Sequence, residues 1–199
     1  MAVVTNEELD EIKKTQGETI GGGLSEDFQF VLRKEGEAGL KQVEAELANL
    51  GYPLKLAEIK NFQWYPFYLN MLLLVVTKNI FQWTDADFRE NGRFSAKVSV
   101  IVRIMVKYFI SLRRVCEQVG SYWRKYYTMG AVNIEKLNEK EKVLVIAFSG
   151  FTGVSSFCRI LEGYIQQIFS YVVPGEKLTV QEIECVLQGG KAHRFKLTW

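Results

Sequence analysis

The chain has 199 residues, of which 48% are hydrophobic and 24% charged, and its formal net charge is +2. This composition suits one globular domain and excludes an intrinsically disordered protein. Residues 1–20 are acidic and polar, unlike a secretory signal, and the longest apolar stretch, residues 64–76, is too short to span a bilayer. Three cysteines do not make a disulfide framework, so we expect a reducing, cytoplasmic setting.

Charge is unevenly distributed along the chain. Residues 1–50 carry 11 acidic and 5 basic side chains, whereas residues 91–130 carry 8 basic and 1 acidic side chain. Either these two segments contact each other or the basic segment meets an anionic partner. Nucleic-acid binding through the basic and aromatic residues of 94–127 is a lesser alternative, because the chain as a whole is nearly neutral and carries no nucleic-acid-binding motif.

The first fifty residues predict two helices separated by a flexible break. Residues 6–16 have the pattern of a short charged helix, and the glycine run 21–23 marks the break. We therefore expect residues 1–25 to form an acidic extension and residues 26–199 to form a single domain. The second helix runs from its cap to its end over residues 25–49.

Further helices are predicted in the middle of the chain. Gly36 is a weak spot within the second helix, because glycine lowers helix stability. Residues 64–80 predict a buried helix with Pro66 in its first turn, where proline is tolerated. Thr84 then caps a short helical turn that stops near Asn91.

The periodicity changes from helix to strand in the second half of the chain. Residues 94–127 have apolar side chains spaced three and four apart, which predicts a long helix with a bend near Ser111 or Gly120. The following segments, residues 131–136 and 141–148, alternate with period two and predict a hairpin.

A helix over residues 157–173 and a terminal hairpin complete the chain. The predicted fold class is therefore α+β: a helical N-terminal half followed by two β-hairpins that flank a helix. The hairpins form an antiparallel sheet of about four strands packed on helices.

The terminal hairpin contains the single histidine and one of the three cysteines. Alternation groups His193 with the apolar residues of the last strand, and Cys185 with those of the strand before it. A three-residue loop, residues 189–191, pairs Leu187 with His193 and keeps both apolar sets on one side of the sheet. We therefore predict that Cys185 and His193 both face the core.

Several short motifs near the C-terminus resemble a known family. A helix that begins Phe157-Cys158-Arg159 and continues Glu162-Gly163-Tyr164 precedes a strand with Glu182-x-Glu184-Cys185, a Gly-Gly turn and His193-x-Phe195. These features are similar to the 4-vinyl reductase, or hydrocarbon-binding, domain. Its superfamily includes haem nitric-oxide-binding sensor domains and subunits of the Golgi transport-protein-particle complex. The resemblance covers roughly residues 28–199 and is specific over residues 157–199. It implies a small-molecule-binding or sensory module with an apolar pocket between helices and sheet.

Haem is the cofactor of some members of this superfamily. Its haem-binding members hold the iron through a histidine on a helix, whereas the single histidine here, His193, lies on the last predicted strand. The sequence therefore argues against haem, and nothing in it supports axial ligation by cysteine or tyrosine.

Cys158, Cys185 and His193 are the candidate metal ligands. A cysteine in the first turn of a helix favours the thiolate, and two thiolates with an imidazole suit zinc. The fourth position would be left to water, a ligand or a carboxylate other than Glu184, which alternation directs away. The alternative, which the spacing favours, is that the cysteines are small buried apolar residues and the histidine bonds a carbonyl.

Aromatic side chains are the candidate ligand-binding residues. The set comprises Phe109, Tyr122, Trp123, Tyr126, Phe157, Tyr164 and His193. Such residues line apolar pockets, and the nearby Arg113, Arg114, Arg124 and Lys125 suggest a carboxylate or phosphate on the ligand. Ordinary core packing is the alternative for the aromatic residues.

Catalysis has little support in the sequence. The glycine run 21–23 lacks the preceding strand and the lysine of a phosphate-binding loop, and no nucleophile–base signature is present. We therefore expect a ligand-binding or sensory module that acts through a partner or pairs through its N-terminal helices. The alternative is a structural or interaction protein with a Cys/His metal site.

Overall fold

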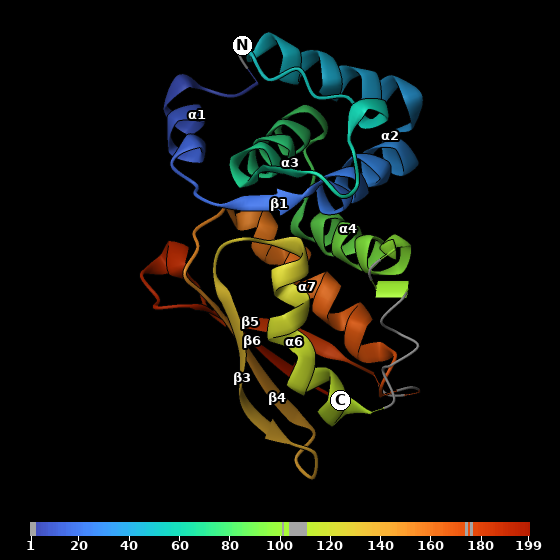
Figure 1. Ribbon diagram of the computed structural model, residues 1–199, viewed down its shortest axis with the longest axis vertical. Helices are drawn as coiled ribbons and strands as arrows, with labels where there is room; N and C mark the ends of the chain where they lie inside the picture. The colour runs from blue at the N-terminus through green and yellow to red at the C-terminus, as the bar shows by residue number, and fades with distance from the viewer. Residues whose placement is uncertain (1–2, 101, 104–110, 174, 176) are drawn as a thin grey trace.

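The computed structural model describes residues 3–100, 102–103, 111–173, 175 and 177–199. Figure 1 shows a group of helices that contains the N-terminus, and a second group in which two helices lie against a twisted sheet. The predicted α+β fold class, with its helical N-terminal half, is confirmed.

The helical half consists of these elements: α1 (Asn6–Lys13), β1 (Glu18–Ile20), α2 (Gly21–Asn49), η1 (Leu56–Glu58), β2 (Trp64–Pro66), α3 (Phe67–Phe81) and α4 (Asp85–Val98). The sheet-containing half consists of α6 (Leu112–Tyr126), β3 (Ala131–Asn138), β4 (Val143–Ser149), α7 (Ser155–Ser170), β5 (Thr179–Glu184), η2 (Val186–Gln188) and β6 (His193–Thr198). Among these described elements, no helix is both long and apolar enough to cross a membrane.

The four-stranded sheet is antiparallel throughout and has the order β3-β4-β6-β5. The first hairpin is where the sequence predicted it, and the terminal strand β6 pairs with both β4 and β5. Two short strands, β1 and β2, form a separate pair within the helical half.

Helix α2 begins four residues earlier than predicted. The glycine run is its first turn rather than a flexible break, and the Gly21 and Gly22 amides donate to the carbonyls of Gln63 and Asn61. A Cβ on Gly21 would lie 2.2 Å from the carbonyl oxygen of Lys60, so only glycine permits this close approach. The weak spot at Gly36 is a real kink, with φ 72° and ψ −174°.

The next two predicted helices also have different bounds. Residues 64–66 are strand β2, and Pro66 is the N-cap residue of α3 rather than part of its first turn. The capping box of Thr84 and Asp87 is present, but α4 continues past Asn91 to Val98. An asparagine–glycine pair did not end the helix, because Gly92 packs against the backbone of α7.

The predicted long helix over 94–127 is interrupted. Ser99 ends α4, and Ser111 caps α6 by accepting a hydrogen bond from the amide of Arg114. The predicted break near Ser111 is therefore found, whereas Gly120 lies inside α6. Part of the predicted run, residues 101 and 104–110, lies outside the described residues.

The terminal hairpin differs from the prediction in its loop. Glu184 pairs with Arg194, so the connection runs over residues 185–192 and includes η2, and Leu187 does not pair with His193. The alternation on β6 is correct, but on β5 the half-buried side chains before the bulge are the even-numbered Val180 and Glu182, and Ile183 is exposed. The turn determines the pairing of the two strands here. It contains the helical turn η2 followed by Gly189 with φ 85°, and the alternation of residues did not reveal it.

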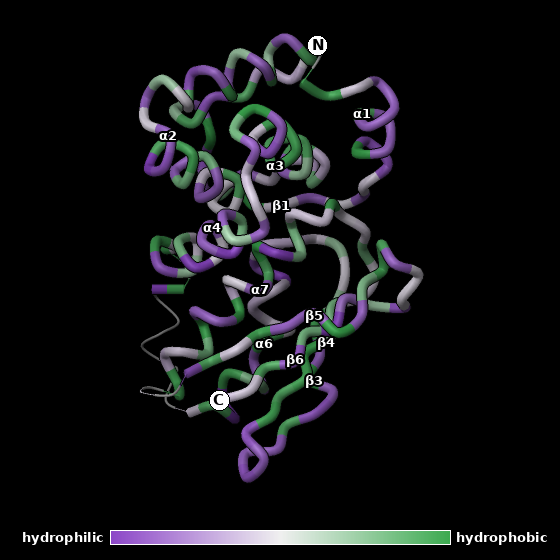
Figure 2. The backbone as a smooth tube through the Cα atoms, turned by 180° about the vertical axis from the view of Figure 1, so that it is seen from behind, coloured by the Kyte–Doolittle hydropathy of each residue, from purple (hydrophilic) through white to green (hydrophobic). Residues whose placement is uncertain are grey.

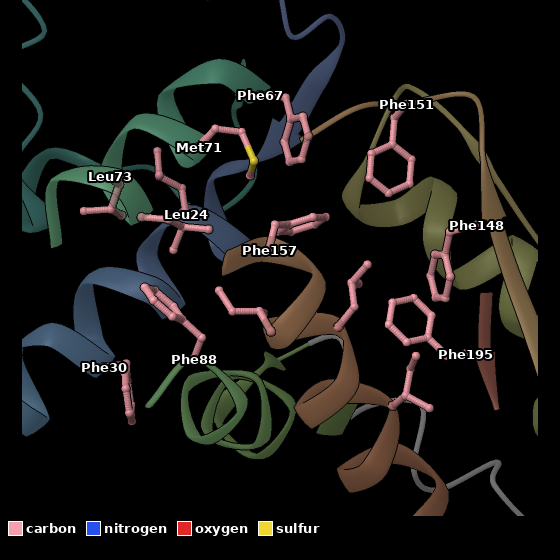
Figure 3. Packing of buried hydrophobic residues seen from close by; sticks show 14 of the residues in the cluster. Leu24, Phe30, Phe67, Met71, Leu73, Phe88, Phe148, Phe151, Phe157 and Phe195 are labelled. Atoms are coloured by element: carbon pink, nitrogen blue, oxygen red, sulfur yellow. The ribbon is translucent and has the colours of Figure 1, made fainter. Parts of the chain in front are cut away.

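The hydrophobic core is continuous between the two halves. Figure 2 shows α3 largely in the hydrophobic colour, and its first residue, Phe67, is fully buried. The ring centroid of Phe67 lies 5.2 Å from that of Phe157 on α7 and 6.3 Å from that of Phe151. Figure 3 shows these three side chains. These edge-to-face contacts join the helical half to the sheet-containing half.

Candidate functional site

A cavity of about 120 Å³ lies between the sheet and the helices. Its walls come from α2, α4, α6, α7, β3 and β4, and most of the lining side chains are aliphatic or aromatic. Helices α6 and α7 contribute the largest share, because their apolar faces turn toward the sheet. Such an apolar space with a few polar groups is typical of a ligand-binding pocket.

Most of the sequence-predicted ligand-binding residues border this cavity. The lining includes Tyr122, Trp123, Tyr126, Phe157 and Tyr164. His193 is buried but is not among the lining residues, and Phe109 lies outside the described residues.

The charged side chains that line the cavity are acidic, which the sequence did not predict. Arg113 and Arg114 are exposed and pair with Glu139 and Glu117, so they do not face the cavity. The described lining contains no lysine, arginine or histidine, and its ionisable carboxyls are those of Glu26 and Asp27.

Asp27 is a fully satisfied buried carboxylate. Its two oxygens accept hydrogen bonds from the side-chain amides of Asn70 at 2.6 Å and Asn91 at 2.7 Å. Burial raises the pKa of Asp27 to about 6, although these two hydrogen bonds act in the opposite direction.

Glu26 is buried at the wall between two cavities. It is 8% exposed and borders both the main cavity and a smaller one of about 50 Å³, as does Tyr126. Burial raises the pKa of the Glu26 carboxyl well above its ordinary value, against a hydrogen bond with Ser99, and the neighbouring Asp27 raises it further. Ser99 also bonds the Tyr126 hydroxyl, so these three side chains form one connected polar group.

A second constellation joins α7 to the terminal hairpin. Cys158 Sγ lies 4.0 Å from Cys185 Sγ and 3.5 Å from His193 Nδ1, and Cys185 Sγ lies 3.6 Å from the same nitrogen. Glu182 Oε1 lies 3.2 Å from His193 Nδ1. The four donor atoms are all within 4.8 Å of one another. The three predicted metal-ligand candidates therefore converge, with Glu182 as a fourth.

The charges around this cluster hold Glu182 ionised. Although burial raises its pKa, hydrogen bonds with His193 and Cys185 and the charge of Arg159 hold the pKa of Glu182 below its ordinary value. Burial and the Glu182 carboxylate raise the pKa of Cys158, so its position near the start of α7 does not produce the predicted thiolate. Without a metal ion, the cluster holds neutral thiols beside a carboxylate.

Sequence reasoning missed the three acidic residues that matter most in these sites. Glu182 was missed because the bulge between Glu182 and Glu184 reverses the alternation that β5 would otherwise follow. Glu26 and Asp27 lie at the predicted start of the second helix, whereas in the structure they are in the second turn of α2, where they turn inward. An acidic pair placed between apolar residues of one helix face was the available signal.

Comparison with known proteins gives a likeness in structure alone. No family model matches the sequence, and no curated protein matches it. Among solved structures, an Fe(II) unliganded H-NOX protein from K. algicida superposes with a TM-score of 0.64 at 12% identity, over 90% of this chain and 95% of the other. An H-NOX protein from S. oneidensis in the Fe(II)NO ligation state gives a TM-score of 0.66 at 12% identity, over 89% of this chain and 97% of the other.

The chain shares the H-NOX fold. This likeness is in fold alone, so the superfamily and the 4-vinyl reductase type of domain that the C-terminal motifs suggested both stay predictions. A third structure of the same fold concerns haem redox potential and porphyrin distortion, with a TM-score of 0.62 at 11% identity over 90% of this chain and 99% of the other.

These neighbours correct the prediction about haem. The sequence argued against it on the position of the single histidine, but the solved structures of this fold include iron-bound and porphyrin-bound proteins. The position of the single histidine is therefore no ground for calling haem unlikely.

Proposed function

We propose that this protein is a sensory module that binds a small apolar or amphipathic molecule in the cavity between α6, α7 and the sheet. The observation that carries the proposal is the cavity itself, whose walls are mostly apolar and whose two carboxyl groups both belong to α2. An engineered apolar cavity of roughly 150 Å³ binds benzene, so a space of about 120 Å³ suits the apolar part of a ligand of that size.

Haem is one candidate for this ligand. The aromatic and aliphatic walls suit an apolar ring, but a porphyrin is several times larger than benzene, so haem would require this space of about 120 Å³ to widen. The described lining offers the tyrosine oxygens of Tyr122, Tyr126, Tyr127 and Tyr164 rather than an imidazole. Bound haem would supply an iron for a diatomic gas, the kind of ligand that the S. oneidensis protein carries in its Fe(II)NO state. The protein's own part would be to exclude water and to hold the ring between α6 and α7.

A sensory module must pass its signal on, and we propose that the signal passes to a partner protein or to a second copy of the chain. The N-terminal helices are the proposed pairing surface, as the resemblance to the 4-vinyl reductase type of domain implies. Ligand binding next to α2 would be transmitted to the helical half, because Glu26 and Asp27 of α2 border the cavity directly.

A cavity-filling variant tests the proposal. In the wild type, toluene, benzyl alcohol or haem is expected to raise the melting temperature, and haem to develop a shifted absorption band. Val119→Phe should abolish both effects, because the new ring occupies the cavity. Val145→Phe is the matched control, since this half-buried valine of β4 is outside the cavity lining. If none of these compounds binds the wild type and native mass spectrometry finds no co-purified molecule, the proposal fails.

We propose a metal site as a second function of the fold, held by Cys158, Glu182, Cys185 and His193. A tetrahedral zinc ion with Zn–S near 2.3 Å and Zn–N or Zn–O near 2.0–2.1 Å implies donor separations of roughly 3.3–3.8 Å. Four of the six separations among these donors run from 3.2 to 4.0 Å, close to this range, and all six are within 4.8 Å. Zinc would displace the thiol protons, and its 2+ charge would offset most of the negative charge of the two thiolates and the carboxylate that the cluster then contains.

Metal analysis of the purified protein tests this second proposal. One equivalent of zinc is expected in the wild type, and the metal should be lost in Cys158→Ser and Cys185→Ser. Cys116→Ser is the control and should retain the metal, because Cys116 lies on α6 outside the cluster. A metal-free wild type that a chelator neither destabilises nor changes would overturn the proposal.

A further inference from the structure

The acidic side of the cavity indicates which class of ligand it takes, an inference that rests on the proposed function. Glu26 and Asp27 are adjacent on α2, yet their surroundings differ. Asp27 receives two amide hydrogen bonds, from Asn70 and Asn91, and needs no further partner. Glu26 has a hydrogen bond with Ser99, and no basic side chain lines either of the two cavities it borders, within the part of the chain that the structure describes.

A buried carboxyl without a cation must carry its own proton. Transfer of an ionised carboxylate into an apolar site is too costly unless an opposite charge accompanies it. The raised pKa of the Glu26 carboxyl is the sign of that cost. A cationic ligand would stabilise such a buried acid in a cavity wall, because the positive charge of the ligand takes the place of the proton.

The position of Glu26 fits a ligand with one polar end. The main cavity on one side of it is apolar, and the smaller cavity on the other side is bordered by Gln29, Asn61 and Ser99. Phe62, which also borders the smaller cavity, is 77% exposed, so this second space adjoins the protein surface. A molecule whose apolar body fills the main cavity would therefore present its polar end at Glu26, next to the surface.

From this geometry we infer that the cavity binds a small amphipathic amine, whose ammonium group pairs with the Glu26 carboxylate while its apolar body lies between α6 and α7. Two adjacent carboxyls disfavour a carboxylate or phosphate at this end of the ligand. A neutral hydroxyl would bond Glu26 but would gain nothing from its charge.

Three probes of the same shape separate the possibilities. Benzylamine, benzyl alcohol and benzoate share one ring and differ in the charge of the polar end, and an alkylammonium group is protonated at neutral pH. Isothermal titration calorimetry is expected to show benzylamine binding at least about tenfold more tightly than benzyl alcohol, because charge-assisted hydrogen bonds exceed neutral ones by about that factor. Benzoate is expected to bind most weakly.

Glu26→Gln is the decisive variant. Glutamine has the shape of the protonated acid and carries no charge, so benzyl alcohol should bind as in the wild type, whereas the advantage of benzylamine should disappear. Retained binding of benzyl alcohol also shows that the cavity is intact. Glu37→Gln is the matched control: it makes the same chemical change on an exposed position of the same helix and should leave the preference unchanged.

The outcomes separate this inference from the proposed function. If benzyl alcohol or haem binds but benzylamine has no advantage, or if Glu26→Gln keeps the advantage, the amine inference is wrong and the cavity proposal stands. If no probe and no haem binds the wild type, both fail. A preference for benzylamine that depends on Glu26 supports both.

Discussion

At the scale of single residues, buried acids distinguish this molecule. Asp27, Glu26, Glu162 and Glu182 are buried or nearly so, and each is treated differently. Amides hold Asp27, Arg89 and Arg159 neutralise Glu162, and Glu182 lies beside two thiols and an imidazole. Glu26 alone among these four borders both cavities. The partner of each acid, rather than its burial, indicates what the acid does.

Asp27 should make folding stability depend on pH. Its folded pKa of about 6 lies above the ordinary value of 3.8, so the stability it contributes is present at acidic pH and is lost as the pH rises through about 6. The loss is expected to be about 3 kcal/mol, from about two pKa units. Urea denaturation at pH 4 and pH 7 should show that the difference in stability between wild type and Asp27→Asn shrinks by this amount.

The same experiment needs a reference for other titrating groups. Glu37→Gln changes an exposed carboxyl on the same helix, and its stability should follow the wild-type curve at each pH. A constant difference between wild type and Asp27→Asn from pH 4 to pH 7 would contradict the assigned behaviour of Asp27.

At the scale of elements, the pairing of α4 with α7 depends on glycine. A Cβ on Gly163 would lie 1.9 Å from the carbonyl oxygen of Arg89, and a Cβ on Gly92 would lie 2.0 Å from that of Ile160. The two helices therefore pack backbone against backbone, and the Arg89–Glu162 ion pair spans them at 2.6 Å. This explains why position 163 is a glycine.

Gly163→Ala should therefore be strongly destabilising. The helices would have to separate, which is expected to cost about 3 kcal/mol in the free energy of unfolding. Gly22→Ala is the control, because a Cβ there would meet its nearest atom at 3.5 Å, an ordinary contact. Equal melting temperatures for Gly163→Ala and the wild type would show that α4 and α7 are not packed as described.

At the scale of the whole molecule, the aromatic cluster around Phe67 joins the two halves. Phe67 contacts Tyr127, Phe151 and Phe157, with ring centroids 5.2–6.3 Å apart. The helical half and the sheet-containing half therefore share one core (Figure 3). A substitution in this cluster is expected to lower the stability of both halves.

Removal of this ring tests how strongly the halves depend on each other. Phe67→Ala is expected to lower the free energy of unfolding by about 3–5 kcal/mol, the usual cost of deleting a buried aromatic side chain. Phe62→Ala, at a position 77% exposed, should change it little. Urea denaturation followed by circular dichroism measures both variants. A small effect of Phe67→Ala would mean that the two halves are stabilised independently.

The α+β class, the order of the main helices and hairpins, and five of the residues that line the cavity were predictable from the sequence. Hydrophobic periodicity is a local property, so it revealed the α6 face with Tyr122, Trp123 and Tyr126, and the alternation on β6 that turns His193 inward. The convergence of Cys158 with Cys185 and His193 followed from a correct alternation on one strand and a resemblance over the last helix.

Only the tertiary structure decided the acidic chemistry of both sites. A bulge on β5 turned Glu182 toward the cysteines, and the glycine-mediated start of α2 against residues 60–63 directed Glu26 and Asp27 into the cavity. Periodicity cannot show a change of register or the partner that a buried charge will meet, because both depend on segments distant in the sequence. For the same reason the likeness to the H-NOX fold, at 11–12% identity, rests on the arrangement of the chain, whereas the C-terminal motifs suggested only a resemblance to a wider superfamily.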